Sequence, residues 1–506
     1  MNNMRMSTKI WLVCLSAMVT AIAFPPYRVG FLVFFSPILL LLALEGLSLR
    51  RAFGIGYIWG LVFNLSVLYG VFWATIPGTF GMLAIVSLVF AVIVAVYRYI
   101  SVRSRLWGYI IWPFLWVSWD YLRTLTEFNF PWGDYGYALS YYLPMIQAAD
   151  IFGVYGISLI IHSVTILLYI LIRHELNRKI RFGLLSAVIV LPLILLLYGW
   201  AKLPAKDNNS EGAFKIALLQ GNITRELKWQ PGGADLSFDE YLEMTRSVLA
   251  DSADLVIWPE TATPFYLAHK PKYLKKVKDL VDSADVNILT GLPQYETAGP
   301  SEYIYFNAAA LISPHVDSLP IYEKVKLVPM SERIPFSGRF KKLRDIHLGQ
   351  ADFSSGRYKS IFSVNNFKFS TVICFESAFP DYCADFCRAG AQFLVIITND
   401  MWFGPSSLPY QHAQMSVLRA VENRIPIARC ANTGVSMFID KWGRTFGTTK
   451  MMQQAVVVNS INPEKSSSLY NRWGDILPLI SIFTTLTIII AVAILKRGQY
   501  NEAYEN

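Results

Sequence analysis

Charge is scarce in this chain, and so are the motifs on which several large enzyme classes depend. Charged residues make up 16% of its 506 residues, and it has 5 cysteines and 6 histidines. The sequence has no G-x-x-x-x-G-K-S/T phosphate loop, no G-x-S-x-G serine elbow and no H-E-x-x-H zinc motif. The histidines are scattered rather than paired at ligand spacing. These absences argue against nucleotide hydrolysis, serine-hydrolase chemistry and a catalytic metal, and nothing in the pattern indicates a cofactor.

Long apolar runs are what the chain has in abundance. Hydrophobic residues account for 54% of it, and a helix needs about 20 apolar residues to cross the hydrocarbon core of a bilayer. We therefore predict a polytopic α-helical membrane domain. Its eight helices are expected near residues 9–25, 30–47, 54–76, 80–98, 106–123, 151–172, 182–200 and 475–495.

The distribution of these runs predicts three parts of the chain. Residues 1–205 form a membrane domain with helices one to seven, and residues 472–506 form a closing transmembrane helix with a tail. Between them, residues 213–465 have the patterning of a soluble domain.

Basic residues recur at alternate ends of the predicted helices, which predicts an orientation because positive charge is retained on the cytoplasmic side. Both termini are then cytoplasmic, and in a bacterial inner membrane the 213–465 domain is periplasmic. The net charge of +9 follows from this arrangement and requires no nucleic-acid partner. The residues that fall on one side are Arg5, Lys9, Arg50, Arg51, Arg98, Arg103, Arg105, Arg173, Arg178, Lys179, Arg181, Lys496 and Arg497.

Short apolar runs alternate with amphipathic segments inside the soluble domain, which is typical of an α/β fold. Helices are expected over Ala234 to Leu249 and His412 to Asn423. The expected strands are Phe214 to Gln220, Leu255 to Trp258, Val286 to Thr290, Ala308 to Ser313, Phe367 to Ile373, Phe393 to Thr398 and Val435 to Ile439.

Three reactive side chains lie at predicted strand ends or in the loops that follow. They are Glu260 after Trp258-Pro259, Lys324 after Tyr322-Glu323, and Cys374 after Ile373. A carboxylate, an amine and a thiol can act as the base, the oxyanion-binding cation and the nucleophile of covalent acyl transfer. Taken singly, each has a structural alternative, since Glu260 could cap a helix, Lys324 could be solvated and Cys374 could be a small core residue.

In the order Glu, Lys, Cys, the three motifs resemble the nitrilase superfamily, and the flanking helices narrow the resemblance to the apolipoprotein N-acyltransferase family. The resemblance covers nearly the whole chain. The motifs that carry it are Gly221-Asn222-Ile223 with Lys228-Trp229, Trp258-Pro259-Glu260-Thr261, Lys324 with Leu327-Val328-Pro329 and Glu332, Cys374-Phe375-Glu376, Asn399-Asp400-Met401-Trp402-Phe403-Gly404, Gln411-His412, Arg419-Ala420 and Asn432-Thr433-Gly434-Val435.

This resemblance implies an α/β nitrilase-like four-layer αββα sandwich and a role for each matching residue. Glu260 is expected to be the general base, Lys324 the oxyanion cation and Cys374 the nucleophile, while Glu332 resembles a second essential carboxylate. The positions that shape the substrate pocket are Trp229, Phe375 and Glu376.

The resemblance also implies the reaction and its partners. A membrane phospholipid is the expected acyl donor, and the acceptor is the α-amine of the N-terminal S-diacylglyceryl cysteine of an apolipoprotein. We expect the acyl group to pass through a thioester on Cys374 and the protein to act as a monomer.

One motif departs from the family pattern. Where Leu-Val-Pro-Phe-Gly-Glu is usual, this chain has Leu327-Val328-Pro329-Met330-Ser331-Glu332. Losing the glycine restricts the backbone to conformations that serine tolerates, which puts the placement of Glu332 in question.

Cys383 and Cys387, four residues apart on a predicted helix, are expected to be buried packing residues.

Two other functions compete with acyl transfer. A membrane-tethered nitrilase-type amidase that hydrolyses a C–N bond would use the same three residues, but one helix would suffice as its tether. A transporter or sensor would explain the helices but not the reactive side chains.

Overall fold

The computed structural model describes residues 4–204, 213–300, 302–344 and 351–502. The chain folds into two compact units. Unit 1 comprises Met1–Thr126, Pro131–Leu203 and Trp473–Asn506, and unit 2 comprises Glu127–Phe130 and Pro204–Arg472.

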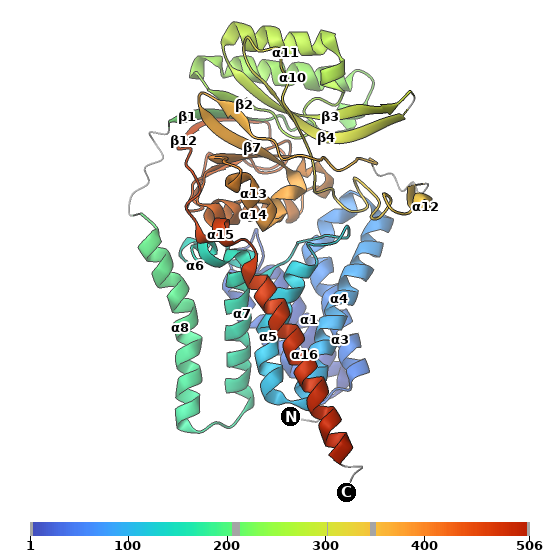
Figure 1. Cartoon of the computed structure of the whole chain (residues 1–506), viewed down its shortest axis with the longest axis vertical. Helices are drawn as coiled ribbons and strands as arrows, with labels where there is room; N and C mark the ends of the chain where they lie inside the picture. Colours follow the sequence, from blue (N-terminus) through green and yellow to red (C-terminus); the bar gives the residue numbers. More distant parts are fainter. Residues whose placement is uncertain (1–3, 205–212, 301, 345–350, 503–506) are drawn as a thin grey trace. The chain divides into compact units, whose positions relative to one another are not determined.

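Unit 1 is a bundle of apolar helices (Figure 1). Within the described residues, five helical stretches are long and apolar enough to cross a membrane: Leu49–Trp73, Gly78–Arg103, Ala149–Arg173, Arg178–Lys202 and Ile476–Ile494. The prediction of a polytopic helical domain is therefore confirmed. The helices of this unit are α1 (Met6–Ile22), α2 (Ser36–Leu44), α3 (Leu49–Leu68), α4 (Ile76–Arg103), α5 (Arg105–Leu122), α6 (Leu143–Ile146), α7 (Ala149–Arg173), α8 (Arg178–Lys202) and α16 (Ile476–Glu502).

The stretch predicted as one helix over 30–47 is divided in the structure. A 3₁₀ turn, Gly30–Phe34, precedes the nine-residue helix α2. Pro37 stands in the first turn of α2, where its missing N–H leaves no helical hydrogen bond unmade, so the residue favours a helix start at this point over a continuous helix.

Two six-stranded sheets form the centre of unit 2. The first has the order β12-β1-β2-β3-β4-β5 and the second the order β11-β10-β9-β8-β7-β6. The strands of the first are β1 (Phe214–Gln220), β2 (Leu255–Ile257), β3 (Asn287–Gly299), β4 (Glu302–Ile312), β5 (Ile321–Glu323) and β12 (Ala455–Ile461). Those of the second are β6 (Phe362–Val364), β7 (Phe367–Ile373), β8 (Phe393–Thr398), β9 (Ile427–Ala431), β10 (Met437–Ile439) and β11 (Thr445–Phe446).

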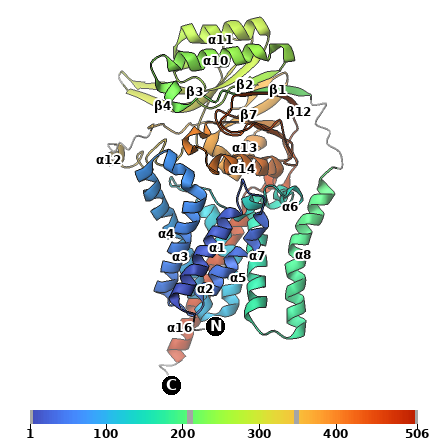
Figure 2. The ribbon, with the colours of Figure 1, turned by 180° about the vertical axis from the view of Figure 1, so that it is seen from behind.

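Helices cover the outer faces of the two sheets (Figures 1 and 2). Helices α10 (Gly233–Ser247) and α11 (Pro271–Ala284) lie on the first sheet, and α13 (Pro380–Arg388) and α14 (Leu408–Asn423) lie on the second. The predicted nitrilase-like α/β domain with two sheets is confirmed. Shorter helices are α9 (Arg225–Trp229), α12 (Lys341–Arg344) and α15 (Leu469–Trp473).

Parallel strands at the centre of each sheet bring their carboxyl ends to one edge. In the first sheet β1, β2 and β3 are parallel, and in the second β7, β8 and β9 are parallel. Every residue of β2, β8 and β9 is buried, as expected for parallel strands covered on both faces. The residues that follow β2, β7 and β8 are therefore held by rigid, buried elements.

The hairpin of β3 and β4 is longer than the apolar pattern predicts. The expected strands covered Val286 to Thr290 and Ala308 to Ser313, whereas the paired register continues to Thr297 opposite Tyr303. The added part is polar and aromatic and is mostly exposed or half-buried, so it has no apolar run from which a strand could be predicted.

Helices α3 and α4 pack closely because glycines face the contact. A Cβ atom added at Gly56 would lie 2.8 Å from the Val94 Cβ and 2.9 Å from the Ala91 Cα, and one added at Gly60 would lie 3.0 Å from the Ser87 Cα. Small residues spaced in this way let helix backbones approach each other in a membrane.

We predict that Gly56→Val forces α3 and α4 apart and destabilises the protein by about 1–3 kcal/mol, the usual cost of overpacking. The measurement is the thermal unfolding midpoint of detergent-solubilised protein. Gly54→Val is the matched control, because a Cβ at Gly54 meets nothing within 4 Å. Equal effects of the two substitutions would contradict the packing argument.

Candidate active site

Glu260 follows β2 and is almost fully buried, at 6% exposure. Its Oε1 accepts a hydrogen bond of 2.8 Å from the Asn307 side-chain amide, and its Oε2 accepts one of 2.8 Å from the Asn399 backbone N–H. The chain beside it approaches β3 so closely that a Cβ at Gly291 would lie 2.6 Å from the Glu260 Cα. These contacts fix the carboxylate and leave it facing the Lys324 ammonium.

Lys324 follows β5 and is 1% exposed. Its Nζ lies 2.8 Å from the Glu332 Oε1 and 3.7 Å from the Glu260 Oε1. Burial alone would lower the pKa of Lys324, but the charges of Glu332 and Glu260 outweigh it and raise the pKa above its ordinary value. The side chain is therefore a permanently charged ammonium inside the protein.

Glu332 reaches this ammonium in spite of the departure from the family pattern. Its Oε1 also accepts a 2.9 Å hydrogen bond from the Asn307 amide, and its Oε2 accepts one of 2.8 Å from the Val328 N–H. The residue of this loop with a left-handed backbone is Met330, at φ 65°, and Ser331 does not share that conformation. Serine at the position of the usual glycine therefore carries no left-handed strain here.

Cys374 begins a 3₁₀ turn, Cys374–Ala378, directly after β7. Its φ is 52°, a left-handed conformation that is uncommon for a residue with a side chain. Burial raises the pKa of the thiol well above its ordinary range, the charge of Glu260 raises it further, and Lys324 acts in the opposite direction. Together these effects favour the protonated form of the thiol, and Glu260 and Lys324 are the charged groups that act on it most strongly.

Glu376 is completely buried, and its carboxylate holds backbone segments of the site in place. Its Oε1 accepts hydrogen bonds from the Val325 and Lys326 N–H groups, at 2.7 and 3.0 Å, and its Oε2 accepts one of 2.9 Å from Ile373. The same carboxylate accepts the Tyr322 hydroxyl at 2.7 Å. One side chain therefore ties the backbone next to Lys324 to the end of β7, the strand that precedes Cys374.

Phe375, next to Cys374, belongs to an aromatic group. Its ring lies 6.1 Å from that of Phe130, in a stacked arrangement, and 5.2 Å from that of Phe379. Phe130 comes from the short segment Glu127–Phe130, which clusters with unit 2. Trp229 is the last residue of α9, and its side chain lies outside what the structure describes.

Cys383 and Cys387 are both buried on α13, in agreement with the predicted packing role. The Cys387 sulfur lies 3.5 Å from the Cys383 backbone oxygen. Burial raises the pKa of Cys383 to about 12, and the charges that act on it most strongly are those of Arg419 and Glu422, so its position on α13 does not favour a role as nucleophile.

Sequence reasoning did not identify Asn307, although its amide joins Glu260 and Glu332. No motif surrounds it, because it stands within β4 beside an ordinary run of alanines.

A second group, Cys374, Asp400 and His412, offers ligand atoms within 4.8 Å of one another. The guanidinium of Arg429 already lies 3.0 Å from the Asp400 Oδ2 and supplies the positive charge that a metal ion would bring.

The two-sheet fold and the grouping of Glu260, Lys324 and Cys374 define unit 2 as a carbon-nitrogen hydrolase domain. The model of the carbon-nitrogen hydrolase family matches residues 215–471. Among solved structures, an amidase from Nesterenkonia sp. is 17% identical and has a TM-score of 0.37, over 51% of this chain and 94% of that chain.

The helical part of the chain narrows this class. The model of the apolipoprotein N-acyltransferase N-terminal domain matches residues 16–167. An apolipoprotein N-acyltransferase of Geobacter metallireducens is 35% identical over 91% of this chain and 91% of its own length. One of Chlorobaculum tepidum is 31% identical over 86% of this chain and 87% of its own length. The chain belongs to the apolipoprotein N-acyltransferase family and is a bacterial membrane-bound acyltransferase.

We predict that Asn307→Leu lowers the rate of acyl transfer by about 10- to 100-fold, because it removes hydrogen bonds to two carboxylates worth about 1.5–3 kcal/mol. The rate is measured on purified protein with phospholipid and a lipopeptide acceptor. Asn287→Leu is the control, since Asn287 opens β3 and its amide donates to the Asp254 backbone oxygen at 3.0 Å. A parental rate in Asn307→Leu would contradict the assigned role.

Proposed function

We propose that the enzyme moves a fatty acyl group from a membrane phospholipid to the α-amine of the N-terminal S-diacylglyceryl cysteine of apolipoproteins, through a thioester on Cys374. The observation that carries this proposal is the grouping of the Cys374 thiol with a buried carboxylate, Glu260, and a buried ammonium, Lys324. The names of the relatives support the lipoprotein acceptor.

The first half-reaction consumes the phospholipid. Glu260 takes the thiol proton of Cys374, and the sulfur attacks the carbonyl carbon of an acyl ester. Lys324 and a backbone N–H stabilise the oxyanion that forms. The C–O bond then breaks, the leaving alkoxide takes the proton from Glu260, and lysophospholipid departs from the thioester.

The second half-reaction regenerates the thiol. The acceptor amine attacks the thioester carbonyl and passes one proton to the Glu260 carboxylate, so that a C–N bond forms. The C–S bond breaks and the Cys374 thiolate recovers a proton from Glu260. The products are an N-acylated lipoprotein and the resting enzyme.

The other site residues act through these three. Glu332 balances the charge of Lys324 at 2.8 Å, which leaves the more distant Glu260, at 3.7 Å, available to accept a proton. Glu376 and Asn307 align the groups, and we assign Trp229 and Phe375 to the walls of the substrate pocket. Because one chain supplies all of these residues, we propose that the enzyme works as a monomer.

Hydrolysis of a C–N bond, with water in place of the amine, is the second candidate. The same three side chains would perform it. The family membership and the polytopic unit 1 favour a lipid donor, because an amidase acting on a small amide needs at most one helix as a tether.

We further propose that the chain crosses the bacterial inner membrane eight times, with both termini in the cytoplasm and the catalytic domain in the periplasm. The alternation of basic residues along the helices supports this topology. Helix α1, the stretch Gly30–Leu44 that ends in α2, and helix α5 would supply the spans beyond the five long apolar stretches.

The proposed topology predicts that a reporter fused after Lys496 is cytoplasmic and that one inserted near Asn208 is periplasmic. Accessibility to a membrane-impermeant thiol reagent in intact cells and spheroplasts checks both positions. A result that puts both reporters on one side would contradict the single closing span that the proposed topology places between them.

The thioester predicts a covalent intermediate. Protein incubated with phospholipid alone should gain one acyl mass at Cys374, and neutral hydroxylamine should release it. Cys374→Ala should gain none, whereas Cys383→Ala and Cys387→Ala, which alter buried thiols on α13, should still be acylated. Acylation that persists in Cys374→Ala would overturn the mechanism.

The oxyanion role predicts that Lys324→Met slows acylation by about 10²–10³-fold, the usual cost of one lost donor. Lys324→Arg should restore the rate only in part, since the planar guanidinium of arginine replaces the compact ammonium of lysine. Lys326→Met is the control, because the Lys326 ammonium lies over the ring of Phe379, 5.2 Å from its centroid, rather than among the carboxylates. Equal losses in the two methionine variants would favour a general basic patch instead.

A further inference from the structure

The nucleophile is held in an unusual backbone conformation by groups outside the catalytic triad. With φ at 52°, Cys374 turns the chain sharply at the end of β7. Its backbone oxygen accepts a 2.8 Å hydrogen bond from the Ser377 hydroxyl and lies 3.1 Å from the His412 Nε2. Strained backbone persists only where surrounding contacts fix it, and these two contacts act on the strained residue itself.

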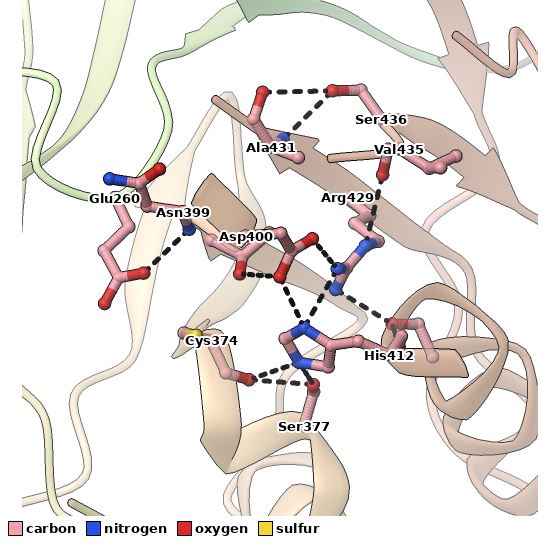
Figure 3. Close-up of polar contacts among 12 residues, drawn as sticks. Glu260, Cys374, Ser377, Asn399, Asp400, His412, Arg429, Ala431, Val435 and Ser436 are labelled. Carbon is pink, nitrogen blue, oxygen red and sulfur yellow. Dashed lines mark hydrogen bonds and ion pairs between the residues drawn. The ribbon is translucent and has the colours of Figure 1, made fainter. Parts of the chain in front are cut away.

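His412 is in turn oriented by a buried ion pair (Figure 3). Its Nδ1 lies 2.8 Å from the Asp400 Oδ1, and the Asp400 Oδ2 lies 3.0 Å from the Arg429 Nη2. An ionised carboxylate and a backbone carbonyl only accept hydrogen bonds, so Nδ1 donates to Asp400 and Nε2 donates to the Cys374 carbonyl, and the ring that makes both contacts is the doubly protonated imidazolium. Figure 3 shows the imidazole between Asp400 and Arg429 on one side and the Cys374 carbonyl and Ser377 on the other.

The ion pair of Asp400 and Arg429 is buried and held by neighbouring backbone. Asp400, His412 and Arg429 are each 1% exposed or less. The Arg429 Nε donates to the Val435 backbone oxygen at 3.2 Å. A Cβ at Gly434 would lie 2.2 Å from the Asp400 Oδ2, so the chain passes against the carboxylate at a distance that only glycine permits. Although burial acts to raise it, the pKa of Asp400 is lowered by His412 and Arg429.

Thr398 joins the same group to the sulfur. Its hydroxyl lies 3.1 Å from the Asp400 Oδ1 and also forms a hydrogen bond with the Cys374 side chain. A hydroxyl has one proton, so it donates to Asp400 while the thiol is protonated and can donate to the sulfur once the thiolate forms. The group therefore contacts Cys374 at both its carbonyl and its side chain.

We propose that Asp400, His412 and Arg429 are positioning residues for the nucleophile: Asp400 and Arg429 orient His412, whose Nε2–H donates to the Cys374 carbonyl and holds the left-handed turn that aims the sulfur at the reacting ester. The inference rests on the proposed function, because it assigns these residues to the acylation of the same thiol.

Two substitutions of His412 separate positioning from simple core packing. In His412→Gln the amide nitrogen can take the place of Nε2 and donate to the Cys374 carbonyl. In His412→Asn the shorter side chain takes the place of Nδ1, so it reaches Asp400 but not that carbonyl. Both remove the imidazole from the same site.

The experiment measures steady-state acyl transfer from phospholipid vesicles to a lipopeptide acceptor and, separately, alkylation of the Cys374 thiol by iodoacetamide at neutral pH. We expect His412→Asn to lower kcat by about 10- to 100-fold with KM unchanged, as for a lost hydrogen bond of about 1.5–3 kcal/mol. His412→Gln should stay within about fivefold of the parent, and alkylation should follow the same order. Equal losses in both variants, or a fall through KM alone, would overturn the inference.

A control variant for correct folding is available on α14, the helix that carries His412. Glu422→Gln breaks a buried pair with Arg419, 2.8 Å apart on α14, without touching Cys374, and should leave kcat near the parental value. An equal loss there would show that α14 is generally sensitive and would overturn the inference. If His412→Asn does not fold, Ser377→Ala removes the other donor to the Cys374 carbonyl, and an unchanged kcat in that variant would also overturn it.

The outcomes also separate this inference from the proposed function. A parent protein that forms no acyl-cysteine while its thiol is still alkylated would refute the thioester mechanism. A parent that is acylated normally, with both His412 variants acylated at the parental rate, would refute only the positioning role.

Discussion

A buried ammonium is the constraint on which the active site depends. A charge removed from water is tolerated only where opposite charges and hydrogen bonds replace the lost hydration. Lys324 meets this requirement with two carboxylates at unequal distances, 2.8 Å for Glu332 and 3.7 Å for Glu260. The nearer one neutralises the cation, and the farther one keeps the freedom to exchange a proton. The same ammonium is then available to an oxyanion without any rearrangement of the protein.

The fold brings this charge to a thiol that comes from the other sheet. Glu260 follows a strand of the first sheet and Cys374 a strand of the second. Glu376 bridges them, because its carboxylate accepts hydrogen bonds from the chain beside Lys324 and from the end of β7. The Asn399 backbone N–H, which follows β8, also donates to Glu260, so hydrogen bonds between groups of the two sheets hold the site together.

The backbone conformation of Cys374, the proposed nucleophile, is a second constraint on the geometry of the site. The left-handed turn at Cys374 costs free energy, of the order of 1–3 kcal/mol for such conformations, and a buried hydrogen-bonded group on β8, β9 and α14 opposes that cost. Asp400 follows β8 much as Glu260 follows β2. Each sheet therefore supplies an acidic residue to the site. Glu260 lies near Lys324, and Asp400 contacts His412 and Arg429.

The sequence was sufficient to predict the elements with clear apolar patterns. Strands β1, β7 and β8 begin and end where their apolar runs do. The outer part of the β3–β4 hairpin could not be predicted, since main-chain pairing holds it together rather than apolar burial. Lys326 shows the same limit at the level of one side chain. An extended chain would send it alongside Lys324, but its ammonium lies over aromatic rings instead.

The site divides along similar lines. Glu260, Lys324 and Cys374 could be proposed because each has a reactive group and a recognisable flank. Asn307 could not, because an amide inside a strand has no distinguishing pattern and its role exists only through two tertiary contacts. The Met330-Ser331 departure could not be evaluated from sequence either, because the family glycine's position and the left-handed position turn out to be adjacent residues.

Kinetic competence of the acyl-enzyme tests the central claim most directly. Protein loaded with one acyl group from phospholipid is freed of donor and mixed rapidly with a diacylglyceryl lipopeptide, and mass spectrometry follows both species in a single turnover. The account predicts that acyl mass leaves Cys374 with the same rate constant with which N-acyl lipopeptide appears, and that the two amounts are equal. Product that forms while the acyl group remains on Cys374 would contradict it.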